Sequence, residues 1–388
     1  MVRSACRLND AHQTDLLGIA VWFGGSYKIV LALSLIARNA GNFRNKVMNK
    51  VKASVIIPTH NRPDKLFDTL AGLKRQQLDA AAFEVVVVDD GSMPPVVISA
   101  SDGGPKLRLE RTEGLERSAA RNRGAAIATG ELLIFIDDDI SVESDFVAAH
   151  LRAHSEWPDV LAVGAVRLPN EAMAEPFARF RQKLEQNAVP HNRGLTQAAN
   201  FCTAANMSIA KDSFAQLGGF DPSISSSEDQ DFALRHTAVA GRIAFVPEAE
   251  AVHRDDALDI RSYCRRAEWG SFKMVPFCQR YPALPENIER DRLNGPMRLD
   301  REALLLSLRK LVKRILAAKP LVALGFAIAS LLERLAPNGR VLDRVYRLLL
   351  GVHILRGYRK GLKLSAPGDP QAAIRPKLAA GSYMGADR

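Results

Sequence analysis

Short apolar runs alternate with stretches of helical periodicity from residue 54 onward. Leu66, Leu70 and Leu73 recur on one face of a predicted helix, whereas the segment 132–136 is apolar at every position. Wholly apolar strands separated by helices are typical of a mostly parallel sheet covered by helices on both faces. The pattern therefore predicts an α/β domain with a Rossmann-like sheet. Its expected strands are 54–57, 83–88, 106–110 and 132–136, and the helices among them are 64–77 and 118–129.

The pattern becomes less regular after Pro158, where the segment 192–205 is rich in loop-forming residues. We therefore divide the expected domain, 51–280, into a regular half, 51–140, and a more variable half, 141–280. The elements expected in the second half are strands at 160–166, 206–209 and 243–246 and helices at 176–186, 211–217 and 228–240.

Polar residues follow directly after three of the expected strands. These groups are 59–62, 89–92 and 137–139. Ligands of parallel α/β sheets bind outside the carboxyl ends of the strands. We therefore expect the three groups to lie on one rim of the sheet and to form a ligand site together.

Asp137, Asp138 and Asp139 are the most informative of these groups. Consecutive carboxylates repel one another, so a fold keeps them at the end of a buried strand only where a cation or hydrogen bonds compensate. Carboxylate oxygens suit Mg²⁺ and Mn²⁺, which bridge them to substrate phosphates. The alternative is a solvated acidic turn. Because the triplet directly follows a buried apolar run, the pattern favours a metal site.

Three further groups are candidates with two interpretations each. Asp229 and Glu228 follow three serines at the start of a predicted helix, where such residues stabilise a helix N-terminus; a carboxylate there would equally serve as a general base. His253 follows a strand, where a lone histidine is a metal ligand or an ordinary structural residue. Arg121 is a candidate phosphate contact or a solvated helical arginine.

The positive charge is concentrated toward the C-terminal end of the chain. The 388 residues carry a net charge of +10, whereas residues 301–363 alone hold fourteen Lys and Arg against three acidic residues, a net charge of +11. Such a positive charge favours binding to nucleic acid, to an anionic membrane or to an anionic substrate. The basic segment lacks interleaved aromatic residues and has a strong apolar component, so we expect no nucleic-acid partner.

Apolar and basic residues alternate at helical spacing within the segment 281–365. Leu308, Leu311 and Ile315 share one helical face, while Arg309 and Lys313 belong to the other. Basic amphipathic helices are typical of membrane-surface binding, so we expect residues 301–363 to contact an anionic membrane surface. The alternative is a helix that packs on the α/β domain and leaves its basic face in solvent.

The two ends of the chain and the cysteines complete the organisation. Residues 1–50 are expected to be an extension outside the fold, with a weak membrane segment at 16–37 as the alternative. Residues 366–388 are rich in Pro and Gly and are expected to be a disordered tail. Four cysteines without zinc spacing indicate a reducing compartment, and we expect a cytoplasmic protein.

Six motifs in this order resemble those of an inverting family 2 glycosyltransferase with the GT-A fold, over residues 53–279. They are Val-Ile-Ile-Pro-Thr-His-Asn-Arg (55–62), Val-Val-Val-Asp-Asp-Gly-Ser (86–92), Ala-Ala-Arg-Asn-Arg-Gly (119–124), Gly-Glu-Leu-Leu-Ile-Phe-Ile-Asp-Asp-Asp (130–139), Gly-Gly-Phe-Asp (218–221) and Glu-Asp-Gln-Asp-Phe-Ala-Leu-Arg (228–235). The resemblance implies a nucleotide-binding half at 51–140 and an acceptor half at 141–280.

The resemblance also implies a role for each motif residue. Asp229 would be the catalytic base, Asp90 would bind the nucleotide base, and His253 would complete a metal site. The implied nucleotide-binding residues are Pro58, Thr59, Asn61, Arg62, Asp90, Arg121 and Asp138, and the implied metal ligands are Asp137, Asp139 and His253. His60 departs from the family pattern, in which a tyrosine is common at this position.

The implied activity is transfer of a sugar from a nucleotide-diphosphate sugar, most commonly a UDP-sugar, with Mn²⁺ or Mg²⁺ and inversion of configuration. The implied acceptor is a hydroxyl of a glycan or lipid-linked molecule in cell-surface polysaccharide or glycolipid synthesis, at the inner face of the cell membrane. One alternative is an inactive relative that binds nucleotide sugars. The other is a sugar nucleotidyltransferase, which would carry a Gly-rich loop after the first strand, where residues 58–63 hold no glycine.

Overall fold

The computed structural model describes residues 51–98, 104–255, 258–300 and 302–365, together with residues 22–23 and 26–27. The chain divides into two units, Met1–Lys50 and Val51–Arg388. In the first unit, β1 (Trp22–Phe23) pairs antiparallel with β2 (Ser26–Tyr27). The weak membrane segment predicted at 16–37 lies outside the described residues apart from these two pairs, and the predicted disordered tail lies outside them altogether.

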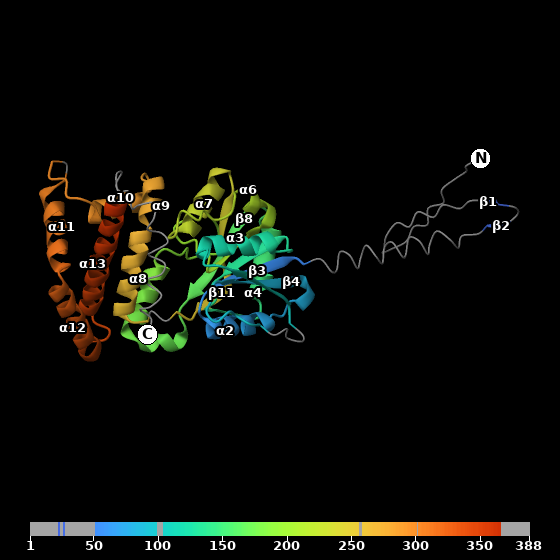
Figure 1. Ribbon diagram of the computed structural model, residues 1–388, viewed down its shortest axis with the longest axis horizontal. Coiled ribbons are helices and arrows are strands. Elements are labelled where there is room, and N and C mark those ends of the chain that lie inside the picture. Colours follow the sequence, from blue (N-terminus) through green and yellow to red (C-terminus); the bar gives the residue numbers. More distant parts are fainter. Residues whose placement is uncertain are drawn as a thin grey trace. The chain divides into compact units, whose positions relative to one another are not determined.

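A twisted sheet of nine strands forms the centre of the described part of the second unit (Figure 1). Its strand order is β5-β4-β3-β6-β10-β8-β11-β7, and β9 pairs with β11. The strands β5, β4, β3 and β6 are parallel to one another, β10 runs antiparallel to both of its neighbours, and β11 is parallel to β8. The predicted mostly parallel α/β architecture is confirmed.

The strands match the expected ones closely where the apolar runs are continuous. These runs form the strands β3 (Ala53–Thr59), β4 (Phe83–Asp90), β5 (Lys106–Thr112), β6 (Leu132–Ile136), β8 (Val160–Arg167) and β10 (Asn206–Ala210). Three further strands are β7 (Ile140–Val142), β9 (Gly194–Thr196) and β11 (Arg242–His253). The expectation at 243–246 is too short, because the register of β11 shifts between Val246 and Ala251 and polar residues interrupt its apolar pattern.

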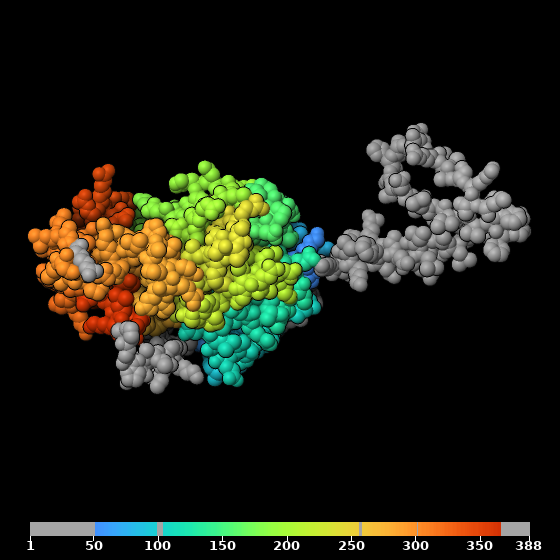
Figure 2. Space-filling model, turned by 90° about the horizontal axis from the view of Figure 1, so that it is seen from above, coloured from blue at the N-terminus to red at the C-terminus, as the bar shows by residue number. Residues whose placement is uncertain are grey.

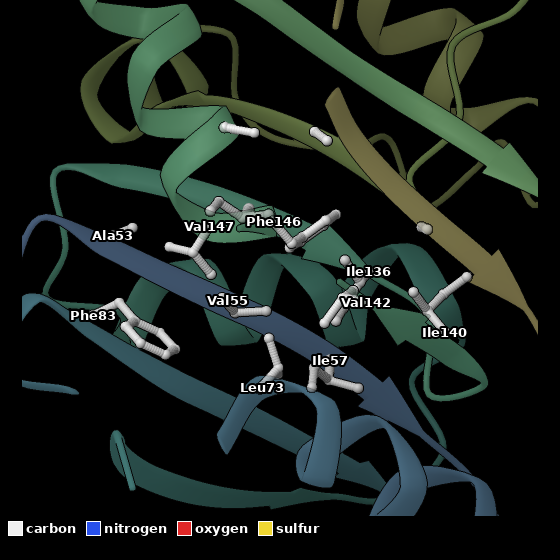
Figure 3. Close-up of a cluster of buried hydrophobic side chains, with 14 of the residues drawn as sticks. Ala53, Val55, Ile57, Leu73, Phe83, Ile136, Ile140, Val142, Phe146 and Val147 are labelled. Atoms are coloured by element: carbon white, nitrogen blue, oxygen red, sulfur yellow. The ribbon is translucent and has the colours of Figure 1, made fainter. Parts of the chain in front are cut away.

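Helices cover both faces of the sheet, and successive residues of β3 alternate between them. Val55 and Ile57 lie in the cluster formed with α2 (Pro63–Lys74) and α4 (Phe146–Glu156), part of which is drawn in Figure 3. Ile56 points to the opposite side, toward α3 (Arg117–Ile127), α6 (Lys211–Gln216) and α7 (Glu228–Ala238). Neither α4 nor β7 was predicted from the sequence.

The remaining helices form a second layered block. They are α5 (Pro176–Gln186), α8 (Ile260–Lys273), α9 (Val275–Arg280), α10 (Pro285–Asn294), α11 (Leu304–Leu316), α12 (Lys319–Leu335) and α13 (Arg340–Leu364). The long helix α13 packs along α8 so closely that a Cβ atom on Gly357 would lie 1.9 Å from the carbonyl oxygen of Glu268. Helices from both sides of residue 280 pack together. The domain boundary expected near this residue stays a prediction.

Among the described helices, none is by itself long and apolar enough to cross a membrane. The pair α11 and α12, bent by 84° at the break between them, meets the length and composition criterion only when the two helices are taken together.

Candidate active site

A cleft of about 950 Å³ opens beyond the carboxyl ends of β3, β4 and β6. Residues from each predicted polar group line it, namely Thr59, Asp90 and Asp137. Asp229 of α7 and His253 of β11 line the same cleft. The three strand-end groups thus meet at one cleft as predicted, and Asp229 and His253 join them from elements outside that prediction.

The loops after β3 and β4 form one wall of the cleft. Pro58, Thr59, Arg62 and Asp90 line it. One oxygen of Asp90, Oδ1, accepts hydrogen bonds from the Thr112 hydroxyl at 2.7 Å and from the Leu115 backbone N–H at 2.6 Å. These bonds fix the carboxylate in place at the end of β4.

Asn61 has a supporting position instead of one on the cleft wall. Its backbone has a positive φ of 54° and its N–H donates to Ser92 Oγ at 2.9 Å. Its side-chain oxygen accepts from the Met93 N–H at 2.7 Å. Asn61 therefore ties the loop after β3 to the loop after β4. Its implied contact with a nucleotide stays a prediction.

Asp138 lines the cleft and shares the Arg62 guanidinium with Asp139. It accepts a hydrogen bond from the Thr59 hydroxyl at 2.7 Å and pairs with the Arg62 guanidinium. Burial raises its pKa to about 6, against the opposing effect of Arg62. Asp138 thus holds the β3 loop against the end of β6.

Asp137, Asp139 and His253 form a cluster whose potential ligand atoms all lie within 4.8 Å of one another. Asp139 Oδ1 is buried and accepts no hydrogen bond of regular geometry, although the His253 Nε2 atom lies 3.1 Å from it. Two carboxylate oxygens and an imidazole nitrogen are donors that suit Mn²⁺. The buried oxygen and the donor set therefore fit a divalent metal.

Backbone pairing between two strands positions His253 in this cluster. The strand β7 begins immediately after Asp139 and runs antiparallel to β11, with Ile140 paired to His253. The N–H of Arg254 also donates to the Asp139 carbonyl at 2.8 Å. Burial would lower the pKa of His253, but its contact with Asp139 and the charge of that carboxylate outweigh burial and raise it.

Asp229 lies in the first turn of α7. Its Oδ1 accepts from the Gln230 N–H at 2.8 Å and its Oδ2 from the Ala204 N–H at 3.3 Å. Burial, followed by the charge of Glu228, raises its pKa to about 7. A carboxylate with a pKa near neutrality is well suited to accept a proton from an attacking hydroxyl.

The serine cap considered in the sequence is absent at this helix terminus. Ser227 occupies the N-cap position with a left-handed φ of 66°, and its side chain makes no capping hydrogen bond. The helix-capping interpretation of the serines before Asp229 is therefore wrong for Ser227. A strained, non-glycine backbone at this point is consistent with a functional constraint on α7.

Arg121 connects the acidic triplet to α7. Its side chain is 1% exposed, and it donates to Asp137 Oδ1 at 2.6 Å and to Glu228 Oε1 at 2.9 Å. Burial raises the pKa of Asp137, but Arg121 and then Arg117 outweigh this effect and hold it well below the usual value. Arg121 does not line the cleft. Its implied nucleotide contact stays a prediction, and its observed role is to pair two buried carboxylates.

Sequence reasoning missed several residues of the cleft. Arg117 is an exposed cation at the start of α3, and the charge of Asp137 is the main cause that raises its pKa. Trp269 and Lys273 of α8 line the opposite wall, and Lys273 pairs with Glu116 at 3.4 Å. Arg117 lies one helical turn before Arg121 and was within reach of sequence reasoning. No pattern in the sequence around Trp269 indicates that it belongs to the site, because only tertiary packing brings α8 to the cleft.

The loop-rich segment 192–205, expected on the acceptor side, reaches the cleft through Ala205 and, just before it, through four consecutive residues. These are Asn200, Phe201, Cys202 and Thr203. They lie beside Asp229, whose carboxylate accepts the neighbouring Ala204 N–H. The acceptor role of this loop stays a prediction.

The proteins that this chain matches are glycosyltransferases. Residues 54–218 match the family model described as Glycosyl transferase family 2. A glycosyltransferase of Haemophilus influenzae is 30% identical over 186 residues, covering 47% of this chain and 60% of that protein. The pre-mycofactocin glycosyltransferase of Mycobacterium tuberculosis is 26% identical over 242 residues, covering 59% of this chain and 48% of that protein. The chain thus spans less than two thirds of these relatives.

A solved structure supports the fold. The mannosyltransferase of Pyrobaculum calidifontis, determined with GDP-Man and Mn²⁺, is 17% identical with a TM-score of 0.50, and the match covers 85% of this chain and 98% of that one. Fold and cleft together define a GT-A type protein. Residues 54–218 thus form a domain of glycosyl transferase family 2.

Proposed function

We propose that this protein transfers a sugar from a nucleotide-diphosphate sugar to an acceptor hydroxyl, with inversion at the anomeric carbon and with Mn²⁺ or Mg²⁺ bound. The proposal is carried by one observation. Asp229, with a pKa of about 7, lines the same cleft as Asp137 and His253, which form a cluster with the buried Asp139. A general base and a metal site in one cleft are the two parts that this reaction needs.

The donor would bind with its diphosphate toward the acidic cluster. Asp137, Asp139 and His253 would hold the divalent ion, which when bound neutralises charge on a diphosphate leaving group. Arg117, exposed in the cleft, would add a positive charge on the same side. Asp90 would accept a hydrogen bond from the nucleotide base. We propose uridine, following the family pattern. The mannosyltransferase of Pyrobaculum calidifontis, which has a similar fold, was solved with GDP-Man, so guanosine belongs in the test.

Asp229 would accept the proton of the acceptor hydroxyl as its oxygen forms a bond to the anomeric carbon. The bond from that carbon to the diphosphate oxygen breaks on the opposite face, and the electron pair leaves with the nucleotide diphosphate. A single displacement with one base inverts the configuration. No covalent intermediate with the protein is required.

A thermal-shift panel tests the donor site. Purified protein would be heated with UDP, GDP and their sugar derivatives, with and without Mn²⁺. We expect stabilisation by one nucleotide family that requires Mn²⁺ and is lost in Asp139→Ala. Asp212→Ala, an exposed carboxylate on α6, is the matched control and should respond as the wild type does. The absence of any metal-dependent shift would contradict the proposal.

A turnover assay separates the enzyme from its closest alternative. With the best donor, the wild type should release nucleotide diphosphate and Asp229→Asn should not, although both bind the donor. Metal-dependent binding without turnover for any acceptor tested would favour the inactive nucleotide-sugar-binding relative. Release of pyrophosphate from a nucleoside triphosphate would favour a sugar nucleotidyltransferase.

The acceptor and the location of the protein are also proposed. We propose a glycan or lipid-linked acceptor in cell-surface polysaccharide or glycolipid synthesis. We further propose a cytoplasmic protein attached peripherally to the inner face of the cell membrane through residues 301–363. The net charge of +11 in this segment supports attachment to an anionic surface.

A further inference from the structure

Helix α11 is packed with its polar side inward. Lys310 is 2% exposed, and its amino group donates to the Pro296 carbonyl at 2.9 Å and pairs with Glu302 at 2.5 Å. Lys313 donates to Asn294 Oδ1 at 2.5 Å. The expectation of a helix that packs by its apolar face and leaves its basic face in solvent is therefore wrong for α11. Lys310 and Lys313 thus face the protein, whereas Arg309 of the same helix stays exposed.

The apolar side of α11 is the exposed one. Leu304 is 83% exposed, and five more aliphatic side chains of the same helix are exposed with it. These are Leu305, Leu308, Leu311, Val312 and Ile315. Protein surfaces in water rarely present so many large aliphatic side chains next to one another.

Helix α12 continues this exposed aliphatic surface. Its inner side buries Val322, Phe326 and Ala329 in the cluster shared with α13. Its outer side exposes five large aliphatic residues, Leu321, Leu324, Ile328, Leu331 and Leu335. A helix that is apolar all round is normally covered on every side by protein or by lipid. We call these eleven exposed side chains of α11 and α12 the aliphatic face.

The aliphatic face lies on the outer layer of the helical block. Figure 1 shows α13 between α8 and the pair α11–α12, and α13 has contacts with all three. In Figure 2 the orange residues of the pair lie at the surface, at the end of the second unit away from the blue strands of the sheet. The aliphatic face therefore belongs to the outermost helices of this block, with α13 separating them from α8 and the cleft that α8 helps to line.

A basic pocket of about 280 Å³ adjoins the break between α11 and α12. It is lined by Ala317 at the break and by residues of α13, including Arg359, Lys360 and Lys363. Within the described residues, no carboxylate pairs with any of these three cations. Three positive charges without an acidic partner in one pocket favour an anionic ligand.

A neighbouring arginine strengthens this argument. Arg314 of α11 has a buried Nε atom without a hydrogen-bond partner. Burial and then the charge of Arg359 lower the pKa of Arg314. Since like charges repel, the fold keeps these guanidinium groups close at a cost that an anion would offset.

We propose that the aliphatic face of α11 and α12 inserts into the interfacial region of a lipid bilayer, and that the basic pocket at their break binds the phosphate of an anionic phospholipid headgroup. This inference deepens the proposed membrane attachment and rests on it. It does not depend on donor binding. The segment thus attaches by apolar insertion together with a specific headgroup contact, instead of by a solvated basic face.

Two observations favour lipid over a second copy of the chain. A second copy would bring the same net charge of +11 against the first, and the two would repel. The aliphatic face also contains only Leu, Ile and Val among its large exposed residues, whereas protein interfaces are enriched in aromatic residues and Met. A bilayer with anionic headgroups complements both the charge and the aliphatic chemistry.

Vesicle flotation of the full chain tests the aliphatic face. Vesicles of phosphatidylcholine alone would be compared with vesicles that also contain phosphatidylglycerol. Leu308→Gln with Leu324→Gln removes two exposed leucines without changing charge, and should lower the partition coefficient for anionic vesicles by at least about tenfold. Val239→Gln, at an exposed valine of the α/β domain, should leave it unchanged.

Charge-matched variants test the pocket. Arg359→Gln with Lys363→Gln should weaken binding to phosphatidylglycerol vesicles several-fold more than Arg334→Gln with Arg340→Gln, two exposed arginines outside the pocket. Equal losses in the two double variants would overturn the headgroup pocket. Saturable stabilisation by glycerol 3-phosphate in a wild-type protein that does not float would assign the pocket to a soluble phosphate compound instead.

The remaining outcomes separate this inference from the proposed function. Failure of the wild type to float, or a leucine double variant that floats equally well, would overturn insertion. A dimer in sedimentation velocity that dissociates in the leucine variant would assign the face to a second copy. The Mn²⁺-dependent shift with nucleotide should persist in every variant, because none of these residues lines the cleft. If the wild type floats with anionic vesicles but shows no Mn²⁺-dependent thermal shift with any nucleotide, the proposed function is contradicted and this inference stands.

Discussion

Arg121 and Glu228 are 107 positions apart in the sequence, yet their side chains lie 2.9 Å apart in a buried ion pair. The same guanidinium also reaches Asp137. Since Asp229 follows Glu228 directly, this arginine couples the position of the general-base candidate to the position of the metal-site candidate. A bidentate guanidinium is well suited to this task because its geometry is planar and fixed.

Removing this arginine should be costly. Arg121→Met would remove the cation that lies between Asp137 and Glu228 and would leave the Glu228 carboxylate without its partner, and we expect a loss of about 3–5 kcal/mol in the free energy of unfolding. Arg121→Lys should recover only part of the loss, because a lysine cannot form both bonds in the same geometry. Urea unfolding followed by circular dichroism measures both variants. Arg123→Ala, at an arginine that forms a more exposed pair with Glu110, is the control and should change stability by less than about 1 kcal/mol.

The pKa of Asp229 sets the expected pH profile of the reaction. The carboxylate must be ionised to accept a proton, and its pKa is raised to about 7. Below pH 7, kcat/KM should therefore fall about tenfold per pH unit, and above pH 7 it should level off. Asp229→Asn should lower kcat by roughly 10²–10⁴-fold while nucleotide binding persists. A wild-type profile that stays flat between pH 5 and pH 8 would contradict the assignment of Asp229 as the base.

A buried histidine, His150, and a partly buried one, His154, should make the fold sensitive to acid. His150 shares hydrogen bonds with Ser208 and Asn206, and His154 bonds to the same serine. Burial lowers the pKa of His150 to about 3 and that of His154 to about 4. The neutral rings are favoured in the folded state, so their contribution to stability is present above pH 6.5 and is lost as the pH falls toward 4. At pH 5 each histidine should cost about 2 kcal/mol relative to neutral pH.

Chemical denaturation at pH 7 and pH 5 measures this effect. His150→Gln should be less stable than the wild type at pH 7 but should lose distinctly less stability on going to pH 5. His191→Gln, at an exposed histidine, should follow the wild type at both values. An unchanged pH dependence in His150→Gln would refute the assignment.

The contact between α8 and α13 should tolerate no added side chain at Gly357. A Cβ there would meet the Glu268 carbonyl oxygen at 1.9 Å, so Gly357→Ala must push the two helices apart, and we expect a loss of about 1–3 kcal/mol. At Gly351 of the same helix, an added Cβ would meet only the flexible Lys313 side chain, at 3.4 Å. Gly351→Ala should therefore be neutral or stabilising by up to about 1 kcal/mol. Thermal unfolding of both variants checks the difference.

The sequence allowed prediction wherever a local pattern determines the outcome. The apolar run before Asp137 fixes a buried strand, and the parallel arrangement then places strand-end residues such as Thr59 and Asp90 on one rim. The strand β7 escaped prediction because three residues are too few to show a period. The pairing of Arg121 with Glu228 was equally invisible, since it depends on where α7 packs against α3.

The orientation of α11 shows a different limit. Its sequence shows two faces clearly, but it does not say which of them meets the protein. That choice is made by Glu302, Asn294 and the Pro296 carbonyl, which supply acceptors for Lys310 and Lys313. These hydrogen-bond partners lie outside the helix, so the periodicity of the helix sequence cannot predict which face of the helix they bind.

The pairing of Ile140 with His253 has a consequence for how such a protein can diversify. The chain leaves the acidic triplet at Ile140, builds α4, α5, the 192–205 loop and α7, and returns to the same place at His253. The short antiparallel pairing of β7 with β11 therefore closes a long excursion of the chain. Insertions or deletions within this segment can reshape the surface around Asp229 without moving His253 from Asp139. The end of the cleft that holds the acidic cluster can stay constant while the rest of its wall changes.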